Sequence, residues 1–183
     1  MARKESITKE ILLQAACELL KEEGEENMTV RKNAAKANCS TQPIFRVFKG
    51  MDDLNETVFM IMAEEFQESA QKAKEYSKLP FVNLGMAYIE CAMRSPNIFK
   101  YLFLPRKKPP MGMYDILTGI EQRVAMEIRR AKELGAADAG GLFSRLWIFI
   151  HGSACMSITG DFDLSMEQTV QMLESAYLAF SGK

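Results

Sequence analysis

Apolar residues recur at helical spacing along most of this chain, and short breaks rich in Pro, Gly and polar residues separate the apolar segments. The spacing predicts helices over about residues 6–23, 51–76, 80–94, 95–104, 114–134, 139–158 and 165–180. Two shorter helices are predicted between residues 29 and 48, joined by a turn at 37–39. We therefore expect an all-α protein.

Local signals mark the ends of the two short helices. Thr29 is placed to cap the first, because its hydroxyl can accept a hydrogen bond from a free backbone N–H of the first turn. Asn38 tolerates the left-handed conformation that a tight turn often needs. Ser40 is expected to cap the second helix, and Pro43 falls in its first turn, where a missing N–H matters least.

The second short helix is predicted to have an apolar face and a polar face. Its apolar set, expected to point inward, is Ile44, Phe45 and Phe48. Its polar set, expected to point outward, is Thr41, Gln42 and Arg46. A helix presented in this way can enter the major groove of DNA with its N-terminal residues near base edges.

Basic residues gather in the same segment. Residues 27–50 hold five basic residues and no acidic one, whereas residues 1–26 hold four basic and seven acidic residues. The net charge of the chain is −1, but residues 1–50 sum to +2 (nine basic, seven acidic) and residues 51–183 to −3 (14 basic, 17 acidic). A basic end on an acidic body fits a protein that contacts nucleic acid at one end only.

From about residue 7 to residue 54 the sequence resembles the DNA-binding domain of the tetracycline-repressor (TetR) family of transcriptional regulators. The family pattern is a helix ending in Gly, a Thr-Val-Arg start, a helix–turn–helix and an aromatic-Arg-x-Phe ending. This chain matches that pattern at Gly24, Thr29-Val30-Arg31, Ala34, Ala37, Ser40, Ile44-Phe45-Arg46, Phe48 and Leu54. The resemblance covers about the first 55 residues, and beyond them it rests on chain length and the helical pattern.

Four positions depart from the family pattern. The turn Gly is replaced by Asn38, and the usual Tyr, whose hydroxyl touches phosphate, is replaced by Phe45. A common His is Val47, and a Lys common at the start of the following helix is Met51. The last three changes remove possible phosphate contacts.

We expect DNA contacts from Arg31, Lys32, Lys36, Ser40, Thr41, Gln42, Arg46 and Lys49. The lysines and Arg31 would hold phosphates, Thr41 and Gln42 would read bases, and Arg46 would do either. Ordinary solvated surface is the alternative interpretation of each of these side chains.

The resemblance implies two domains, a helix–turn–helix domain over residues 1–50 and a helical ligand-binding and dimerisation domain over 51–183, with 51–76 as connector. As in the resembled family, the last two helices of each chain (139–158 and 165–180) would form a four-helix homodimer bundle. The dimer would then present its two helix–turn–helix domains, or heads, to a palindromic operator in double-stranded DNA, with half-sites about 34–36 Å apart or a multiple of that. The expected dimer interface comprises Gly152, Ser153, Met166, Val170, Leu173, Tyr177 and Phe180. Alternatively, the helices over 139–158 and 165–180 only complete the core of a monomer.

A pocket for a small, largely apolar effector is expected inside the C-terminal bundle. Its candidate lining is Met86, Tyr88, Cys91, Phe99, Phe103, Tyr114, Trp147, His151 and Cys155. Each of these residues also suits an ordinary core, and His151, the single histidine, is expected to be a hydrogen-bonded core residue. The segment 105–110, with three prolines and three basic residues, is expected to be an extended surface loop.

Several classes of protein find no support in the sequence. The four cysteines are isolated, so neither a disulfide framework nor a metal site is expected, and one histidine supplies no catalytic triad. No cofactor motif such as G-x-G-x-x-G is present, and we expect no enzyme activity. No apolar run is long enough to span a membrane and no signal peptide is recognisable, so a cytoplasmic location is expected.

The sequence thus predicts a dimeric, sequence-specific DNA-binding regulator of transcription, a repressor released by its effector. The alternative is a helical ligand-binding or protein-interaction module whose head has weakened DNA binding, consistent with Phe45, Val47 and Met51.

Overall fold

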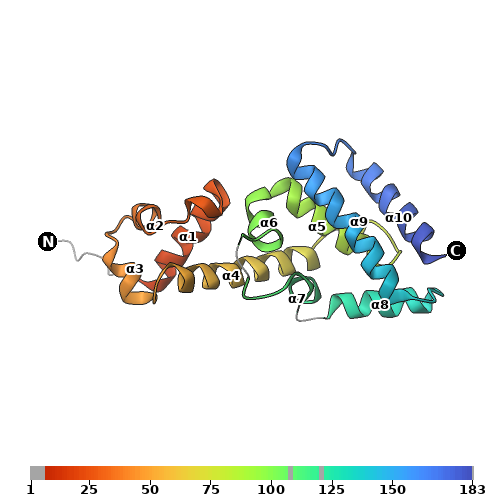
Figure 1. The fold of residues 1–183 in the computed structure, drawn as a ribbon, viewed down its shortest axis with the longest axis horizontal. Coiled ribbons are helices and arrows are strands. Elements are labelled where there is room, and N and C mark those ends of the chain that lie inside the picture. The colour runs from red at the N-terminus through yellow and green to blue at the C-terminus, as the bar shows by residue number, and fades with distance from the viewer. Residues whose placement is uncertain (1–6, 107–108, 120–121, 183) are drawn as a thin grey trace. The chain divides into compact units, whose positions relative to one another are not determined.

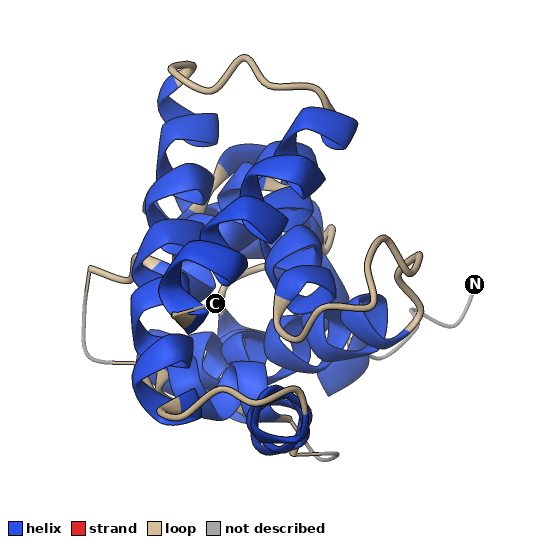
Figure 2. Cartoon of the chain, turned by 90° about the vertical axis from the view of Figure 1, so that its right-hand side faces the viewer, coloured by secondary structure: helices blue, strands red, loops and turns tan. Residues whose placement is uncertain are grey.

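The computed structural model describes residues 7–106, 109–119 and 122–182, and it contains helices and loops (Figures 1 and 2). In chain order the elements are α1 (Lys9–Glu23), the 3-10 helix η1 (Glu25–Asn27), α2 (Val30–Lys36), α3 (Gln42–Val47), α4 (Met51–Gln71), α5 (Val82–Arg94), α6 (Pro96–Phe103), α7 (Met113–Thr118), α8 (Arg123–Glu133), α9 (Ala139–Thr159) and α10 (Met166–Ser181). No strand occurs in the described ranges, so the all-α prediction is confirmed. No helix among these residues is long and apolar enough to cross a membrane.

Side-chain caps set the start of several helices. Thr29 Oγ1 accepts a hydrogen bond from the Lys32 N–H at 3.3 Å, which confirms the predicted cap of α2. Ser165 and Gln168 form the reciprocal capping box of α10, with N–H to oxygen distances of 2.9 and 3.2 Å. α1 begins at Lys9, three residues later than predicted, because Thr8 caps it. A cap of this kind stabilises a helix by about 1 kcal/mol.

The predicted helix over 114–134 is two helices, so that prediction is wrong. α7 ends at Thr118 and α8 begins at Arg123, and Gly119 between them has a left-handed φ of 57°. Gln122 is also left-handed, with φ 52°, which an α-helix does not accommodate. Residues 120 and 121 lie outside the described residues.

The predicted connector helix ends earlier than expected, at Gln71 rather than Tyr76. The Asn83 side chain fixes the segment after it, because Asn83 Oδ1 accepts from the Tyr76 and Ser77 N–H groups at 2.7 and 3.0 Å. Asn83 Nδ2 also donates to the Ser77 carbonyl at 2.7 Å. The polar sequence that suggested a longer helix therefore forms a loop tied to the start of α5.

Packing divides the chain into two compact units, Met1–Glu64 with Asn97–Pro110, and Glu65–Pro96 with Met111–Lys183. The first contains α1 to α3, the start of α4 and α6, and the second contains the end of α4, α5 and α7 to α10 (Figure 1). The domain division expected after residue 50 stays a prediction.

α6 is fastened to the rest of the first unit at two points. Asn97 Nδ2 donates to the Lys21 carbonyl at 3.0 Å, and the Tyr101 hydroxyl donates to the Asn55 carbonyl at 2.7 Å. The rings of Phe59 and Tyr101 lie 5.7 Å apart. The first unit is thus completed by a helix that follows α5 in sequence.

The second unit is built around α5, which packs against α9 and α10. Gly85 allows this approach, because a Cβ at that position would lie 2.7 Å from Ile150 Cδ1 and 3.3 Å from Leu173 Cδ1. Phe81, at the start of α5, is fully buried with a left-handed φ of 66°, and its N–H donates to Glu127 Oε2 at 2.8 Å. Burial and this bond hold a conformation that a Phe residue rarely adopts.

Candidate nucleic-acid interface

α2 and α3 form a helix–turn–helix. Asn38 has φ 51°, as predicted for the turn, and the Cys39 N–H returns to the Ala34 carbonyl at 2.9 Å. The left-handed Asn38 and this hydrogen bond end α2 and turn the chain toward α3. The predicted Ser40 cap is wrong, because α3 begins at Gln42 and the position before it is Thr41, which makes no side-chain cap bond.

α3 has one buried side and one exposed side. Ile44 is fully buried, and Phe48, just after the helix, is 3% exposed. Gln42 and Arg46 are exposed, as are Thr41 and Ser40 before the helix, so the outward polar face is where the sequence predicts it.

The prediction that Phe45 points inward is wrong, because its side chain is 59% exposed. Consecutive helical residues are rotated by about 100°, and the rotation of α3 that buries Ile44 leaves Phe45 on the solvent side. Phe45 lines a surface hollow together with Ser40, Gln42, Pro43 and Arg46. An apolar ring therefore stands among the predicted base-reading residues.

Two of the predicted phosphate-binding lysines are ion-paired with α1. Lys32 contacts the carboxylate of Glu23, and its Nζ also donates to Asn27 Oδ1 at 2.7 Å. Lys36 pairs with Glu22 at 2.7 Å and with Glu18 at 3.7 Å. Hydrogen bonding to Glu22 is the main cause that raises the pKa of Lys36.

The other predicted phosphate-binding cations are not paired in this way. Arg31 and Lys49 are exposed and form no ion pair with any described residue. Arg46 Nη2 donates to the Ile7 carbonyl at 3.2 Å, and no acid of the described residues pairs with its guanidinium group. The Lys49 N–H donates to Asp53 Oδ2 at 2.9 Å, but that bond involves the backbone and not the ammonium group. Positive charge is thus unpaired at both ends of the helix–turn–helix.

The predicted effector residues divide between the two units. In the second unit the Tyr88 hydroxyl lies 2.8 Å from His151 Nδ1, His151 Nε2 lies 3.6 Å from Cys155 Sγ, and the Tyr88 and Trp147 rings lie 4.9 Å apart. These four side chains form a cluster, which we call the Tyr88 cluster. Phe99 and Phe103 pack against each other and belong to the first unit.

The remaining predicted effector residues differ in exposure. Met86 is fully buried, and burial raises the pKa of the Cys91 thiol to about 12. Tyr114 is 52% exposed, although its ring lies 6.3 Å from that of Phe143. Phe143 stacks on Trp147 at 5.6 Å, and Met113 Sδ lies 3.6 Å from the Tyr88 hydroxyl. The sequence pattern did not single out Phe143 and Met113 as effector residues, because only the fold brings them to the Tyr88 cluster.

Burial inside the Tyr88 cluster shifts its titratable groups in the direction of their neutral forms. Burial raises the pKa of the Tyr88 hydroxyl and of the Cys155 thiol, and it lowers the pKa of His151. The indole N–H of Trp147 is buried and has no hydrogen-bond partner among the described residues. The cluster is therefore uncharged near neutral pH and holds one unused donor.

The predicted dimer residues lie on two sides of α9 and α10. Ser153, Leu173 and Tyr177 are 6%, 0% and 1% exposed within the protomer, so their placement on a dimer surface is wrong. Gly152 is exposed, and the partly exposed members of the set are Met166, Val170 and Phe180. The exposed apolar side chains of these two helices are Ile148, Met156 and Leu178, at 75%, 46% and 47%.

Comparison with solved structures extends over nearly the whole chain. A TetR-like transcriptional regulator from Rhodococcus sp. RHA1 matches with a TM-score of 0.65 and 16% identity, covering 96% of each chain. A TetR-family regulator from Haemophilus influenzae matches with a TM-score of 0.63 and 21% identity, covering 93% of this chain and 94% of that one. The chain has the fold of the TetR-family regulators.

This TetR fold includes the C-terminal part, which the sequence likeness did not reach. A TetR variant from Acinetobacter baumannii in complex with minocycline also matches, with a TM-score of 0.57 and 18% identity, covering 97% of this chain and 98% of that one. The Rhodococcus and Haemophilus proteins are described as transcriptional regulators. No protein-family model and no curated protein matches the sequence.

Proposed function

We propose that the chain is a sequence-specific DNA-binding regulator of transcription, and that α3 reads the major groove. The observation that carries this proposal is the polar face of α3, where Gln42 and Arg46 are exposed opposite the fully buried Ile44. A Gln side chain can bond both the acceptor and the donor of adenine, and Arg can do the same for the acceptors of guanine. The TetR fold supports the proposal, because its matched structures are described as transcriptional regulators.

The predicted phosphate-binding residues differ in how available their charges are to DNA, because some are ion-paired within the protein. Arg31 and Lys49 have charges that no described acid compensates, so they are available to DNA. Lys36 is bound to Glu22 and Glu18, and a phosphate would have to compete with both carboxylates. We therefore assign the larger share of phosphate binding to Arg31 and Lys49, and a smaller share to Lys36.

DNA sequences selected from a random pool provide the test, with binding followed by fluorescence anisotropy against random DNA. Gln42→Ala should lose discrimination between the selected and random duplexes, by about 1–3 kcal/mol. Arg31→Ala should weaken binding to both duplexes and reduce the salt slope by about one unit. Lys132→Ala, which removes an exposed cation from α8, is the matched control.

A failed selection, or equal effects of Gln42→Ala on selected and random DNA, would overturn the proposal. It would favour a helical ligand-binding or protein-interaction module instead. The exposed Phe45 ring and the pairing of Lys32 and Lys36 with acids are the observations that favour this second function.

The proposal includes a small, largely apolar effector that binds at the Tyr88 cluster and releases DNA, as a repressor requires. Its support is the packing of the Tyr88 and Phe143 rings against Trp147, whose buried indole N–H has no hydrogen-bond partner among the described residues. An effector with an apolar body and one acceptor would satisfy that donor. Because Trp147 is the single tryptophan of the sequence, its fluorescence reports binding directly in a titration.

We also propose that α9 and α10 form a homodimer interface, which would present two heads to a palindromic operator. Ile148, Gly152 and Met156 recur every four residues and therefore share one exposed face of α9. Leu178 adds an exposed apolar side chain on α10. Burying such side chains between two copies removes apolar surface from water, at roughly 25 cal/mol per Å².

A further inference from the structure

α3 carries an exposed apolar side chain that hydrogen bonding to bases does not explain. The structure describes every residue of α3, and Phe45 is its one apolar residue with an exposed side chain, at 59%. Single exposed apolar residues are common on protein surfaces, so exposure alone assigns no role to this ring. Its position among side chains proposed to contact DNA is what gives it one.

The Phe45 ring lies beside the side chains proposed to read bases. Gln42 is three positions before Phe45, and exposed residues three apart on a helix are neighbours on its surface. Among the described residues, the hollow beside the ring is lined by Ser40, Gln42, Pro43, Phe45 and Arg46, none of which is acidic. A group brought to this hollow therefore meets an apolar ring next to the amide of Gln42.

The charge around the ring suits a nucleic acid. Arg31, Arg46 and Lys49 form no ion pair with any described acid. Residues 27–50 together hold five basic residues and no acidic one. Because phosphates border both grooves of DNA, uncompensated cations around an exposed ring favour DNA over a neutral protein surface as its partner.

DNA offers one apolar group to such a ring. In the major groove an A·T pair presents the C5-methyl group of thymine together with the adenine acceptor and donor that a Gln side chain can bond. Phe is one of the side chains that make apolar contact with this methyl group. A ring three positions from Gln42 is thus placed for the methyl group of the same base pair or of the next one.

We propose that Phe45 is a specificity-determining residue, whose ring contacts the C5-methyl group of a thymine beside the base that Gln42 bonds. This inference rests on the proposed reading of DNA by α3, and it adds an apolar contact to the hydrogen bonds. The contact involves no charge and releases no counterions, so its contribution to binding should not depend on salt.

The test replaces thymine by deoxyuridine, which pairs with adenine in the same way but lacks the methyl group. Each thymine of a duplex selected from a random pool is replaced in turn, and binding of the full chain is measured by fluorescence anisotropy. At one thymine of a half-site the replacement should weaken binding by about fourfold, because burying one methyl group is worth about that factor. The factor should be the same at low and at high salt.

Variants of the ring assign the contact to Phe45. Phe45→Ala should bind the thymine duplex about fourfold more weakly than the wild type does, and it should bind the thymine and deoxyuridine duplexes equally. Phe45→Leu keeps an apolar side chain and should retain part of the preference for thymine. Met126→Ala, which shortens an exposed apolar side chain of α8, is the matched control and should keep the full preference.

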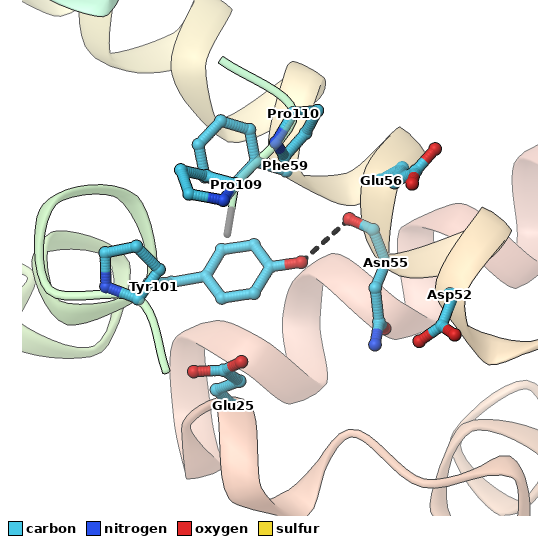
Figure 3. Close-up of a pocket in the computed structure, with 9 residues that line it drawn as sticks. Glu25, Asp52, Asn55, Glu56, Phe59, Tyr101, Pro109 and Pro110 are labelled. Carbon is cyan, nitrogen blue, oxygen red and sulfur yellow. Dashed lines mark hydrogen bonds between the residues drawn. The ribbon is translucent and has the colours of Figure 1, made fainter. Parts of the chain in front are cut away.

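These substitutions should leave the fold of the first unit intact. Ile44 and Phe48 supply the buried side of the helix–turn–helix. The hydrogen bond from the Tyr101 hydroxyl to the Asn55 carbonyl fastens α6 to α4 (Figure 3). Phe45 takes part in neither arrangement, and circular dichroism of each variant establishes that a loss of binding is not a loss of fold.

Three results would overturn the proposal. Equal binding of the thymine duplex and of every deoxyuridine duplex would mean that no methyl group is read, while a loss of discrimination in Gln42→Ala would still support base reading by α3. An undiminished preference for thymine in Phe45→Ala would mean that another side chain contacts the methyl group. A failed selection would remove the DNA function together with this inference, and it would favour a protein partner for the exposed ring.

Discussion

At the scale of single residues, Asn33 in α2 is the least satisfied side chain of the helix–turn–helix. It is 1% exposed, and neither its amide oxygen nor its amide nitrogen has a hydrogen-bond partner among the described residues. Replacing such a group by an apolar one of similar shape removes a desolvation penalty. Asn33→Leu should therefore raise the free energy of unfolding by about 1–3 kcal/mol, measured by urea or thermal unfolding.

Asn83 provides the matched control, because its side chain makes three hydrogen bonds to the loop before α5. Asn83→Leu should lower the free energy of unfolding, in the opposite direction to Asn33→Leu. If Asn33→Leu were also destabilising, the amide of Asn33 would have to be satisfied in solution.

His151 predicts a pH dependence of stability, since burial lowers its pKa below the ordinary value of 6.5. Between the lowered pKa and 6.5 the unfolded chain binds more protons at this residue than the folded chain does, so stability rises with pH through that window. Unfolding free energy measured in urea should therefore fall from pH 7 to pH 5. The sequence has no other histidine, so His151→Gln should flatten this part of the curve, and an unchanged slope would contradict the assignment.

Residue signals that act within one helical turn were predictable from the sequence. Thr29 and Ser165 cap their helices as expected, because a cap needs only residues three positions apart. The pairing of Lys32 and Lys36 with acids of α1 was not predictable, because it depends on how closely α1 and α2 pack. The same limit applies to Tyr88 and His151, which are 63 positions apart in sequence.

At the scale of elements, the contact between α5 and α9 depends on Gly85. A methyl group there would lie 2.7 Å from Ile150 Cδ1, which is closer than carbon atoms approach. Gly85→Ala should lower stability by about 1–3 kcal/mol, since packed helices resist added volume. Gly140→Ala in α9 is the control, because nothing lies within 4 Å of its added methyl group.

Thermal unfolding measures this pair of variants. Gly85→Ala should lower the melting temperature by about 2–4 °C for each kcal/mol lost, as expected for a chain of this size. Gly140→Ala should leave it unchanged or raise it, because Ala favours a helix over Gly by about 1 kcal/mol. Equal effects of the two substitutions would mean that helix propensity, and not packing, decides the result.

The sequence pattern predicted where helices occur, but it did not predict where a helical stretch is interrupted. The apolar spacing over 114–134 suits one helix, and nothing in it shows that Gly119 and Gln122 are left-handed and separate α7 from α8. Leu173 and Tyr177 of α10 were likewise recognised as apolar and expected at the dimer interface, but they face the protomer core. Periodicity shows that a face is apolar without showing which neighbour covers it.

At the scale of the whole molecule, the homodimer is the assembly that α9 and α10 predict. Ile148→Glu combined with Leu178→Glu should shift the protein to a monomer at micromolar concentration, because each places a charge on an apolar interface. Sedimentation equilibrium measures the change. Leu134→Glu, which alters an equally exposed Leu after α8, should not change the mass. A wild-type monomer at micromolar concentration would contradict the dimer.

The first unit is assembled from two separate stretches of sequence, and this has a consequence for its synthesis. A ribosome that has reached residue 64 has made the helix–turn–helix but not α6, whose Asn97 and Tyr101 bind Lys21 and Asn55. All of α5 must emerge before the first unit can acquire these bonds. A gene fragment that ends after residue 64 would therefore encode an incomplete first unit. Any recombination that exchanged the first unit between such proteins would have to include residues 97–110 as well.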